Sequence, residues 1–138
     1  MTTGEAIRRV DELKPNAYTD QMKISWLSEL DGKIFEEVIL THIDEHIPPP
    51  GIFYPHDAPE MEVEVFSEYS TLEDELIVPF PYAGDVYTFY LMSQIDLHNA
   101  ETAKYNQSIT LYNAAYQTYF DWYNRTHKPI RKGRRIRF

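Results

Sequence analysis

Two histidines four residues apart are the first candidates for chemistry in this sequence. His42 and His46 share one face of a helix if a helix continues through them, and Asp44 and Glu45 lie between them. Imidazole and carboxylate groups are common zinc ligands. The order differs from the zinc-protease motif, in which glutamate directly follows the first histidine, and no third ligand is evident. We therefore predict no metal site and no bound cofactor.

Other catalytic arrangements are equally sparse. Asp96 and His98 are two residues apart and would face different sides of a helix. The acidic run from Glu60 to Glu75 lacks the glycine spacing of a calcium-binding EF-hand loop. The chain has no cysteine, which removes thiol nucleophiles and disulfides. These observations predict that the protein is not an enzyme. An enzyme that uses His42 and His46 is the least favoured of the three functions considered for this chain.

Charge is divided very unevenly along the 138 residues. Residues 125–138 hold seven of the 13 Lys and Arg, whereas residues 1–124 hold all 22 Asp and Glu. The first part has six basic residues and therefore a net charge of −16, against +7 for the second. Because phosphate contacts require clustered Lys and Arg, the acidic body is not expected to bind nucleic acid. Only the basic tail has that composition.

The tail, residues 129–138, has three interpretations: an idle solvated segment, a nucleic-acid anchor, or a segment that docks on another protein. It is too charged to fold alone, so we expect it to become ordered only on a partner. An electrostatic anchor does not need the apolar Ile136 and Phe138, whereas a docked segment can bury them. We therefore favour protein docking. The predicted partner-binding residues are Ile130, Arg131, Lys132, Arg134, Arg135, Ile136, Arg137 and Phe138.

Two helices are expected before the first proline cluster. Thr2 and Glu5 have the spacing of a capping box and open a short amphipathic helix. A second helix should begin at Thr19 or Asp20, and its apolar stripe is wide enough to predict burial on more than one side. It should end by Ile47, before three consecutive prolines.

Residues 48–81 contain seven of the nine prolines and interrupt the helical pattern. Residues 60–65 alternate acidic and apolar side chains, the period of a strand with one wet face, and Leu76 to Val78 are a plausible second strand. A two-stranded ribbon is only marginally stable by itself in water, so it must pack against the helices or against another subunit. We expect this excursion to contact a neighbouring subunit or the next layer of an assembly.

A third helical region is expected from about Asp85 to about His127. Its second half has the alternating three- and four-residue spacing of one helix face, and its members are Tyr105, Ile109, Tyr112, Tyr116, Tyr119 and Tyr123. This stripe can be part of the protein's own core or, in part, a subunit contact. The pair His98 and Asn99 marks either a break between two helices or a kink.

Two stretches of the chain resemble a known family. ISWLSELDGKIFEEVILTH (residues 24–42) and LIVPFPYAGDVYTFYLMSQIDLHNAETAKYNQSITLYNAAYQTYFDWYNRTH (residues 76–127) resemble head-tail adaptor proteins of tailed phages and of prophages of Gram-positive gut bacteria. These viral proteins are also called connector or head-completion proteins. The likeness is strongest in the second stretch, through its Pro-Tyr turn, IDLHN and the YN, YNAAY and YNRTH pattern.

The resemblance implies a structural protein of the virion neck, assembled in the host cytoplasm. It implies a homo-oligomeric ring of twelve subunits beneath the portal protein, which extends the DNA channel and accepts the next neck or tail component. In such adaptors the C-terminal segment commonly grips the portal. No membrane contact is implied. The alternative is a small oligomeric regulatory protein that binds nucleic acid through the basic tail.

The expected architecture is therefore mainly α. Residues 1–128 should form a bundle of three to four helices with a short two-stranded β excursion at about 48–81, and residues 129–138 an extended basic C-terminal tail.

Overall fold

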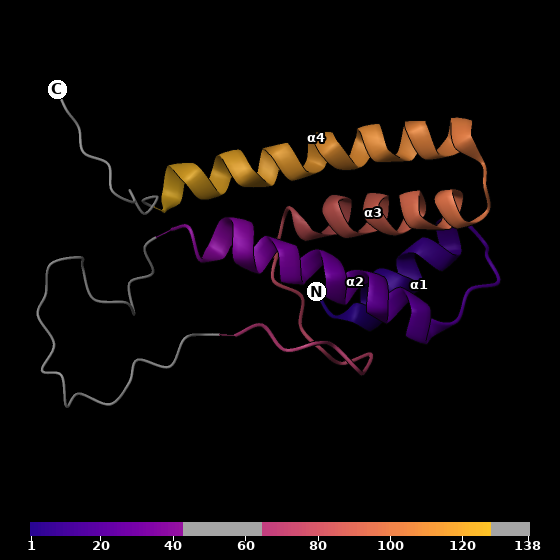
Figure 1. Cartoon of the computed structure of the whole chain (residues 1–138), viewed down its shortest axis with the longest axis horizontal. Coiled ribbons are helices and arrows are strands. Elements are labelled where there is room, and N and C mark those ends of the chain that lie inside the picture. The colour runs from indigo at the N-terminus through magenta and orange to yellow at the C-terminus, as the bar shows by residue number, and fades with distance from the viewer. Residues whose placement is uncertain (43–64, 128–138) are drawn as a thin grey trace, which may run out of the picture.

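The computed structural model describes residues 1–42 and 65–127, and within these ranges the protein is mainly helical, which confirms the predicted class (Figure 1). The elements are α1 (Thr3–Leu13), α2 (Asp20–Ile34), the π-helical turn η1 (Phe35–Ile39), α3 (Ala83–His98) and α4 (Thr102–Thr126). The basic tail and nearly all of the predicted first strand lie outside the described residues.

Helix α1 begins where the sequence predicts. The Thr2 hydroxyl accepts a hydrogen bond from the Glu5 amide (3.2 Å), and the Glu5 carboxylate accepts one from the Thr2 amide (2.9 Å), so the capping box is complete. The helix buries Ala6, Ile7 and Val10. Gly4 allows a close approach to the 70s loop, because a Cβ atom there would lie 2.9 Å from the Leu72 carbonyl oxygen.

Helix α2 is capped by Thr19, whose hydroxyl accepts a hydrogen bond from the Met22 amide (3.2 Å). The prediction that α2 is buried on more than one side is confirmed by a set of buried residues that surrounds much of the helix: Lys23, Ile24, Trp26, Leu27, Ser28, Leu30, Asp31 and Ile34. The helix widens into η1 and ends at Leu40, well before the proline cluster. Thr41 closes this end by donating its hydroxyl to the Glu37 and Val38 carbonyls.

The predicted second strand at Leu76 to Val78 is wrong. Residues 65–82 form an irregular segment without a strand, and an isolated β-bridge joins Thr2 to Glu75. The amides that a partner strand would have paired instead bind groups of the helical body. Leu76 donates to the Met1 carbonyl, while Ile77 and Val78 donate to side chains. This half of the excursion therefore leans on the helices of its own chain, one of the two supports expected for it. Its contact with a neighbouring subunit or with the next layer of an assembly stays a prediction.

Asp31 on α2 is the anchor of this irregular segment. Its carboxylate has no solvent exposure and accepts hydrogen bonds from the hydroxyls of Tyr69 and Tyr87, both at 2.6 Å, and from the Ile77 amide at 3.0 Å. The Tyr87 hydroxyl in turn accepts from the Val78 amide (2.9 Å). One buried carboxylate thus connects α2, α3 and the 65–82 segment.

The third helical region consists of two antiparallel helices, which answers the question that the sequence left open. After α3, Glu101 donates its amide to the Asp96 carbonyl and Ala100 donates to the Leu97 carbonyl, the two bonds of a Schellman motif. Ala100 adopts the left-handed conformation that the motif requires, with φ of 58°. The chain reverses here, so α4 returns alongside α3 (Figure 1).

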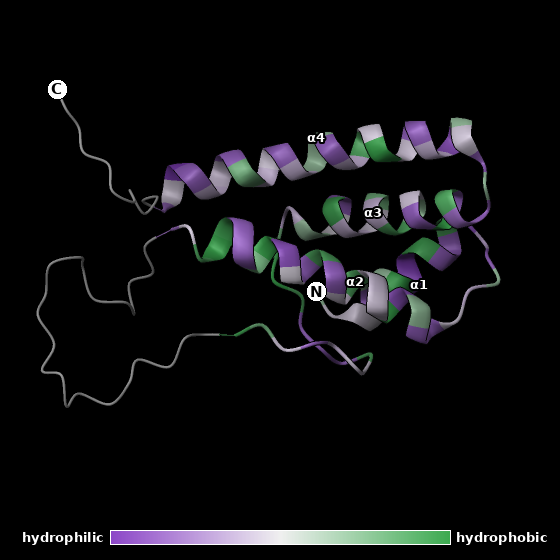
Figure 2. Ribbon diagram, in the orientation of Figure 1, coloured by the Kyte–Doolittle hydropathy of each residue, from purple (hydrophilic) through white to green (hydrophobic). Residues whose placement is uncertain are grey.

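Helix α3 occupies the middle of the structure, between α4 on one side and α1 and α2 on the other (Figure 1). Its fully buried residues include Val86, Tyr87, Leu91 and Ile95. Apolar residues recur along every helix, and those of α3 are surrounded by the other elements (Figure 2). Helix α4 is the outermost layer of the described residues, and they pack on only one of its sides.

Candidate protein-binding surface

The side chains first considered for chemistry hold helices together. Asp96 is fully buried; its carboxylate accepts from the Lys14 ammonium and from the Ser108 hydroxyl (2.7 Å), which joins α1, α3 and α4. His98 is exposed and packs against the Trp26 ring at 4.9 Å. As predicted, the two lie on different faces of α3. Within residues 1–42 and 65–127, no three His, Asp or Glu side chains are grouped so as to hold a metal ion.

His42 is a buried connection between η1 and the end of α4. Its Nδ1–H donates to the Val38 carbonyl (2.5 Å), and its Nε2 is hydrogen-bonded to the Asn124 side chain (2.6 Å). The Tyr123 ring packs edge-on against the imidazole at 4.7 Å. Both ring nitrogens are thus engaged within the protein. His46, Asp44 and Glu45 lie outside the described residues.

The tyrosine stripe of α4 packs largely within its own chain. Tyr119 is fully buried, Tyr112, Tyr116 and Tyr123 are half-buried, and Tyr112 contacts Tyr90 of α3 with ring centroids 5.3 Å apart. Burial raises the pKa of Tyr90 to about 12 and raises the pKa of Tyr112 and Tyr119 as well. These phenols therefore stay neutral near pH 7.

Two amide side chains of α4 bind groups other than the tyrosine hydroxyls. Asn124 binds His42, and Gln117 donates to the Asp121 carboxylate at 2.8 Å. The sequence spacing identified the buried face of α4 correctly, but it could not identify which amide would bind which group.

An aromatic cluster covers the end of the bundle at which α4 terminates. We call it the aromatic end, and it consists of His42, Tyr82, Tyr119, Phe120, Trp122, Tyr123 and His127. Trp122 packs on Tyr82 with centroids 5.2 Å apart, and His127 stacks on Tyr123 at 3.9 Å with nearly parallel rings. Only Tyr119 and His42 are buried, so the other five rings are partly open to a partner.

Phe80 adds an exposed ring near this surface. It lies between Pro79 and Pro81 immediately before α3, and 92% of its surface is accessible. The Pro79 carbonyl accepts from the amides of Tyr82 and Ala83 (2.9 and 3.0 Å), which fixes the loop to the start of α3. Sequence reasoning did not single out Phe80 or Trp122. The Pro-Phe-Pro-Tyr run was the available signal, because an aromatic residue between two prolines has little helix or strand to join.

A groove of about 480 Å³ lies beside η1. It is lined by Glu29, Gly32, Lys33, Phe35, Glu36, Leu40, Val65 and Phe66. Val65 is 78% exposed and Leu40 is 40% exposed, so apolar surface is also available along this part of the bundle. In Figure 1, the C-terminal end of α2, which continues into η1, and the last turn of α4 lie toward the same end of the molecule.

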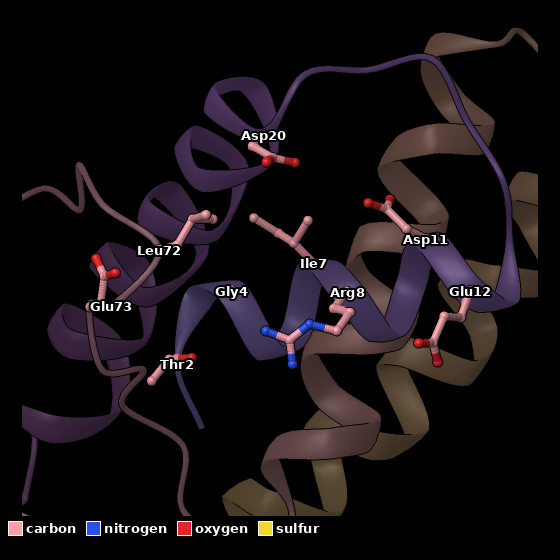
Figure 3. Close-up of a pocket in the computed structure, with 9 residues that line it drawn as sticks. All are labelled: Thr2, Gly4, Ile7, Arg8, Asp11, Glu12, Asp20, Leu72 and Glu73. Carbon is pink, nitrogen blue, oxygen red and sulfur yellow. The ribbon is translucent and has the colours of Figure 1, made fainter.

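A second hollow, of about 610 Å³, lies between α1, the start of α2 and the 70s loop (Figure 3). Ile7 and Leu72 point into it, while Asp11 and Asp20 lie at its edge (Figure 3). Asp11 already accepts a hydrogen bond from the buried Lys23 ammonium at 2.6 Å. The hollow is wide and open, and its lining provides no convergent set of groups for catalysis.

The predicted partner-binding residues of the tail, Ile130 to Phe138, lie outside the described residues, so their role stays a prediction. In the sequence they follow α4, whose last turns belong to the aromatic end. None of the helices in the described ranges combines the length and apolar character needed to span a bilayer. No protein-family model, curated protein or solved structure matches the chain.

The connection through His42 gives a testable expectation. Replacing His42 or Asn124 with alanine should lower the free energy of unfolding by about 1 to 2 kcal/mol, because each change leaves a partly buried hydrogen-bonding group unsatisfied. The last two turns of α4 should then exchange their amide hydrogens faster, as measured by hydrogen–deuterium exchange. Asn113→Ala, at an exposed site on the same helix, is the control. Unchanged exchange in both variants would show that this contact does not hold the helix end.

Proposed function

We propose that the protein is a structural adaptor of a tailed-phage neck, which forms a homo-oligomeric ring beneath the portal protein and binds it through residues 129–138. This ring of twelve subunits would extend the DNA channel and accept the next neck or tail component. The proposal rests on the family resemblance of residues 24–42 and 76–127, combined with the aromatic end as the observation that carries a binding function.

The aromatic end supports a protein partner rather than a small-molecule substrate. Partly exposed tyrosine, tryptophan and phenylalanine are enriched at protein interfaces, where they provide large contact areas at low entropic cost. Here Tyr82 packs on Trp122, and Phe120 packs on His42, which also contacts Tyr123; all three α4 residues belong to the last two turns of the helix, which the tail follows in the sequence. A partner bound by the tail would therefore meet this surface as well.

The excess of acidic side chains favours a body that lets DNA pass over one that binds DNA. The described residues carry 16 Asp and Glu against seven Lys and Arg. A channel built from such subunits would not hold a passing duplex by phosphate contacts, which require clustered basic side chains. The side chains best suited to chemistry, Asp31, Asp96 and His42, are engaged in holding helices together. This use favours a non-enzymatic protein.

The second candidate function is regulation through nucleic-acid binding. The observation that favours it is the composition of the tail, in which five of the residues 129–138 are Lys or Arg. In that case the body would oligomerise and the tail would bind phosphates, with an affinity that falls steeply as salt concentration rises.

Assembly with the portal protein encoded in the same genome tests the proposal. We expect the isolated chain to associate weakly and the mixture to form a ring on the portal, as measured by light scattering and electron microscopy of the complex. A chain that forms a permanent dimer, does not bind the portal and binds double-stranded DNA would contradict the adaptor proposal. That result would favour regulation through nucleic-acid binding. Portal and tail genes beside this one would support the adaptor independently.

A further inference from the structure

The outward face of α4 has an unusual composition for a surface of this protein. Residues 105–120 contain no Asp, Glu, Lys or Arg, although 25% of the chain is charged, a share that would place four charged residues in this stretch. The exposed side chains of the stretch are all neutral: Asn106, Gln107, Thr110, Leu111, Asn113, Ala114, Gln117 and Thr118. A solvated helix face normally carries charges, so this face calls for another explanation.

The residues that the structure describes leave this face uncovered. Helix α4 packs against α3 through its opposite side, the tyrosine stripe, and forms the outer layer of the bundle (Figure 1). Leu111, in the middle of the face, is 43% exposed. Within residues 1–42 and 65–127, nothing therefore covers the neutral face along most of the length of α4.

The face is also less polar than its residue types suggest. The Thr110 hydroxyl donates to the Asn106 carbonyl (2.7 Å), and the Thr118 hydroxyl donates to the Ala114 carbonyl (3.0 Å). Both hydroxyls are thus satisfied inside the helix. What remains for a partner is a surface of methyl groups, one leucine and several amide side chains.

We propose that the neutral face of α4 binds a second copy of this chain and forms a subunit interface of the assembly. This inference rests on the proposed ring and names the surface that builds it. Because the body of each copy is acidic, two copies repel each other over most of their surfaces, and contact is least costly where charge is missing. Asn and Gln also carry a donor and an acceptor each, so this face can bind polar groups on a different surface of the neighbouring copy, which is the kind of contact that closes a ring.

Other occupants fit the face less well. Double-stranded DNA requires Lys or Arg against its phosphates, and residues 105–120 have none. A basic segment such as the chain's own tail would gain more by binding carboxylates than by binding a neutral helix. A helix face of small and medium-sized side chains allows close packing of another helix, and the copies of this protein are helical in the described ranges.

Site-specific thiol protection in the full-length chain tests the inference without disturbing the interface by charge. The chain has no cysteine, so Ala114→Cys introduces a single reactive thiol on the neutral face, and Ser25→Cys introduces one on the exposed side of α2 as a control. We expect maleimide labelling of the thiol at position 114 to slow by about tenfold or more as the chain assembles, since a packed interface excludes the reagent. Labelling at position 25 should slow much less.

A second experiment adds charge to the neutral face of α4. Gln107→Glu combined with Ala114→Glu should raise the concentration needed for assembly by about tenfold or more, because buried like charges oppose association. The same two added charges in Gln21→Glu with Ser25→Glu should have a much smaller effect. Circular dichroism establishes that each variant is folded.

The outcomes separate this inference from the proposed function. If the chain assembles on the portal while position 114 stays reactive and the charged double variant assembles normally, the interface lies elsewhere and the inference is overturned, although the adaptor stands. Protection of position 114 by the portal alone, with the chain monomeric by sedimentation, also overturns it. If the chain assembles through this face but never binds the portal, the interface is supported and the adaptor function fails.

Discussion

Replacing Asp31 with alanine should lower the free energy of unfolding by about 3 to 5 kcal/mol, a large share of the roughly 5 to 15 kcal/mol typical of a native domain. The Asp31 carboxylate accepts from two phenols at 2.6 Å and from the Ile77 amide at 3.0 Å. Alanine would leave these donors without their acceptor inside the protein. Chemical denaturation followed by circular dichroism measures the loss.

Tyr87→Phe tests the same network from its other side. The Tyr87 hydroxyl donates to Asp31 and accepts from the Val78 amide, so its removal breaks two buried hydrogen bonds. We expect a loss of about 2 to 4 kcal/mol. Tyr69→Phe breaks one bond at a half-exposed site and should cost about 1 kcal/mol.

The contribution of Asp31 to the stability of the protein should change with pH in a defined direction. Burial raises the pKa of Asp31, against the opposing effect of the hydrogen bonds from Tyr69 and Tyr87. The folded protein therefore holds this proton more tightly than the unfolded chain does. Its stabilising contribution is fully present below the ordinary aspartate pKa of about 3.9 and is lost as pH rises through the raised folded value. Consequently, the stability difference between the wild type and Asp31→Asn should be larger near pH 4 than near pH 7.

Glu29→Ala is the control for these variants, because Glu29 is an exposed acid on the same helix and its loss should change stability by less than about 0.5 kcal/mol. If Asp31→Ala proved as stable as this control, the anchoring role of the carboxylate would be refuted. Deleting residues 56–75 tests the contribution of the irregular segment to stability. The deletion removes Tyr69 and the Leu72 carbonyl that accepts from the Gly4 amide, so we expect it to lower the free energy of unfolding of the helical body.

The second large effect is expected in the tail. Replacing Ile136 and Phe138 together with alanine should weaken attachment to the portal more than replacing Arg131 and Lys132 together. Burial of each large apolar side chain contributes roughly 1.5 to 3 kcal/mol before ordering costs. An exposed ion pair contributes about 0 to 1 kcal/mol. Titration of portal with each full-length variant measures the difference.

Salt dependence distinguishes the two kinds of contact further. Screening weakens exposed ion pairs but not buried apolar contacts. Portal binding should therefore persist at elevated salt in the wild type. If the Arg131 and Lys132 pair proves more important, and truncation at residue 128 abolishes binding to DNA rather than to portal, the nucleic-acid interpretation replaces the adaptor.

Local sequence was sufficient to predict where helices begin and which faces they bury. Thr2 with Glu5 and the Thr19 cap identified the first two helices, since capping depends on side chains within one turn of the chain. The tyrosine spacing identified the inner face of α4, since that periodicity follows from helix geometry. Pro48 similarly limited how far α2 could extend.

The error at Leu76 to Val78 shows what local pattern omits. Three consecutive β-branched or apolar residues indicate a strand, yet a strand exists only if another strand pairs with its amides. Here the Ile77 amide donates to the Asp31 carboxylate, 46 residues away, and the Val78 amide donates to the Tyr87 hydroxyl. Such a choice depends on which groups the packed helices bring near the segment, and no feature within residues 76–78 records it.

The sequence by itself determined the helical class, the helix caps, the inner stripe of α4 and the separation of an acidic body from a basic tail, because each depends on neighbouring residues or on composition. Only the tertiary structure decided that Asp31 would anchor an irregular segment, that His42 would bind Asn124, and that the rings from Tyr82 to His127 would gather at one end. These arrangements join residues tens of positions apart. Packing, rather than local preference, brings them together.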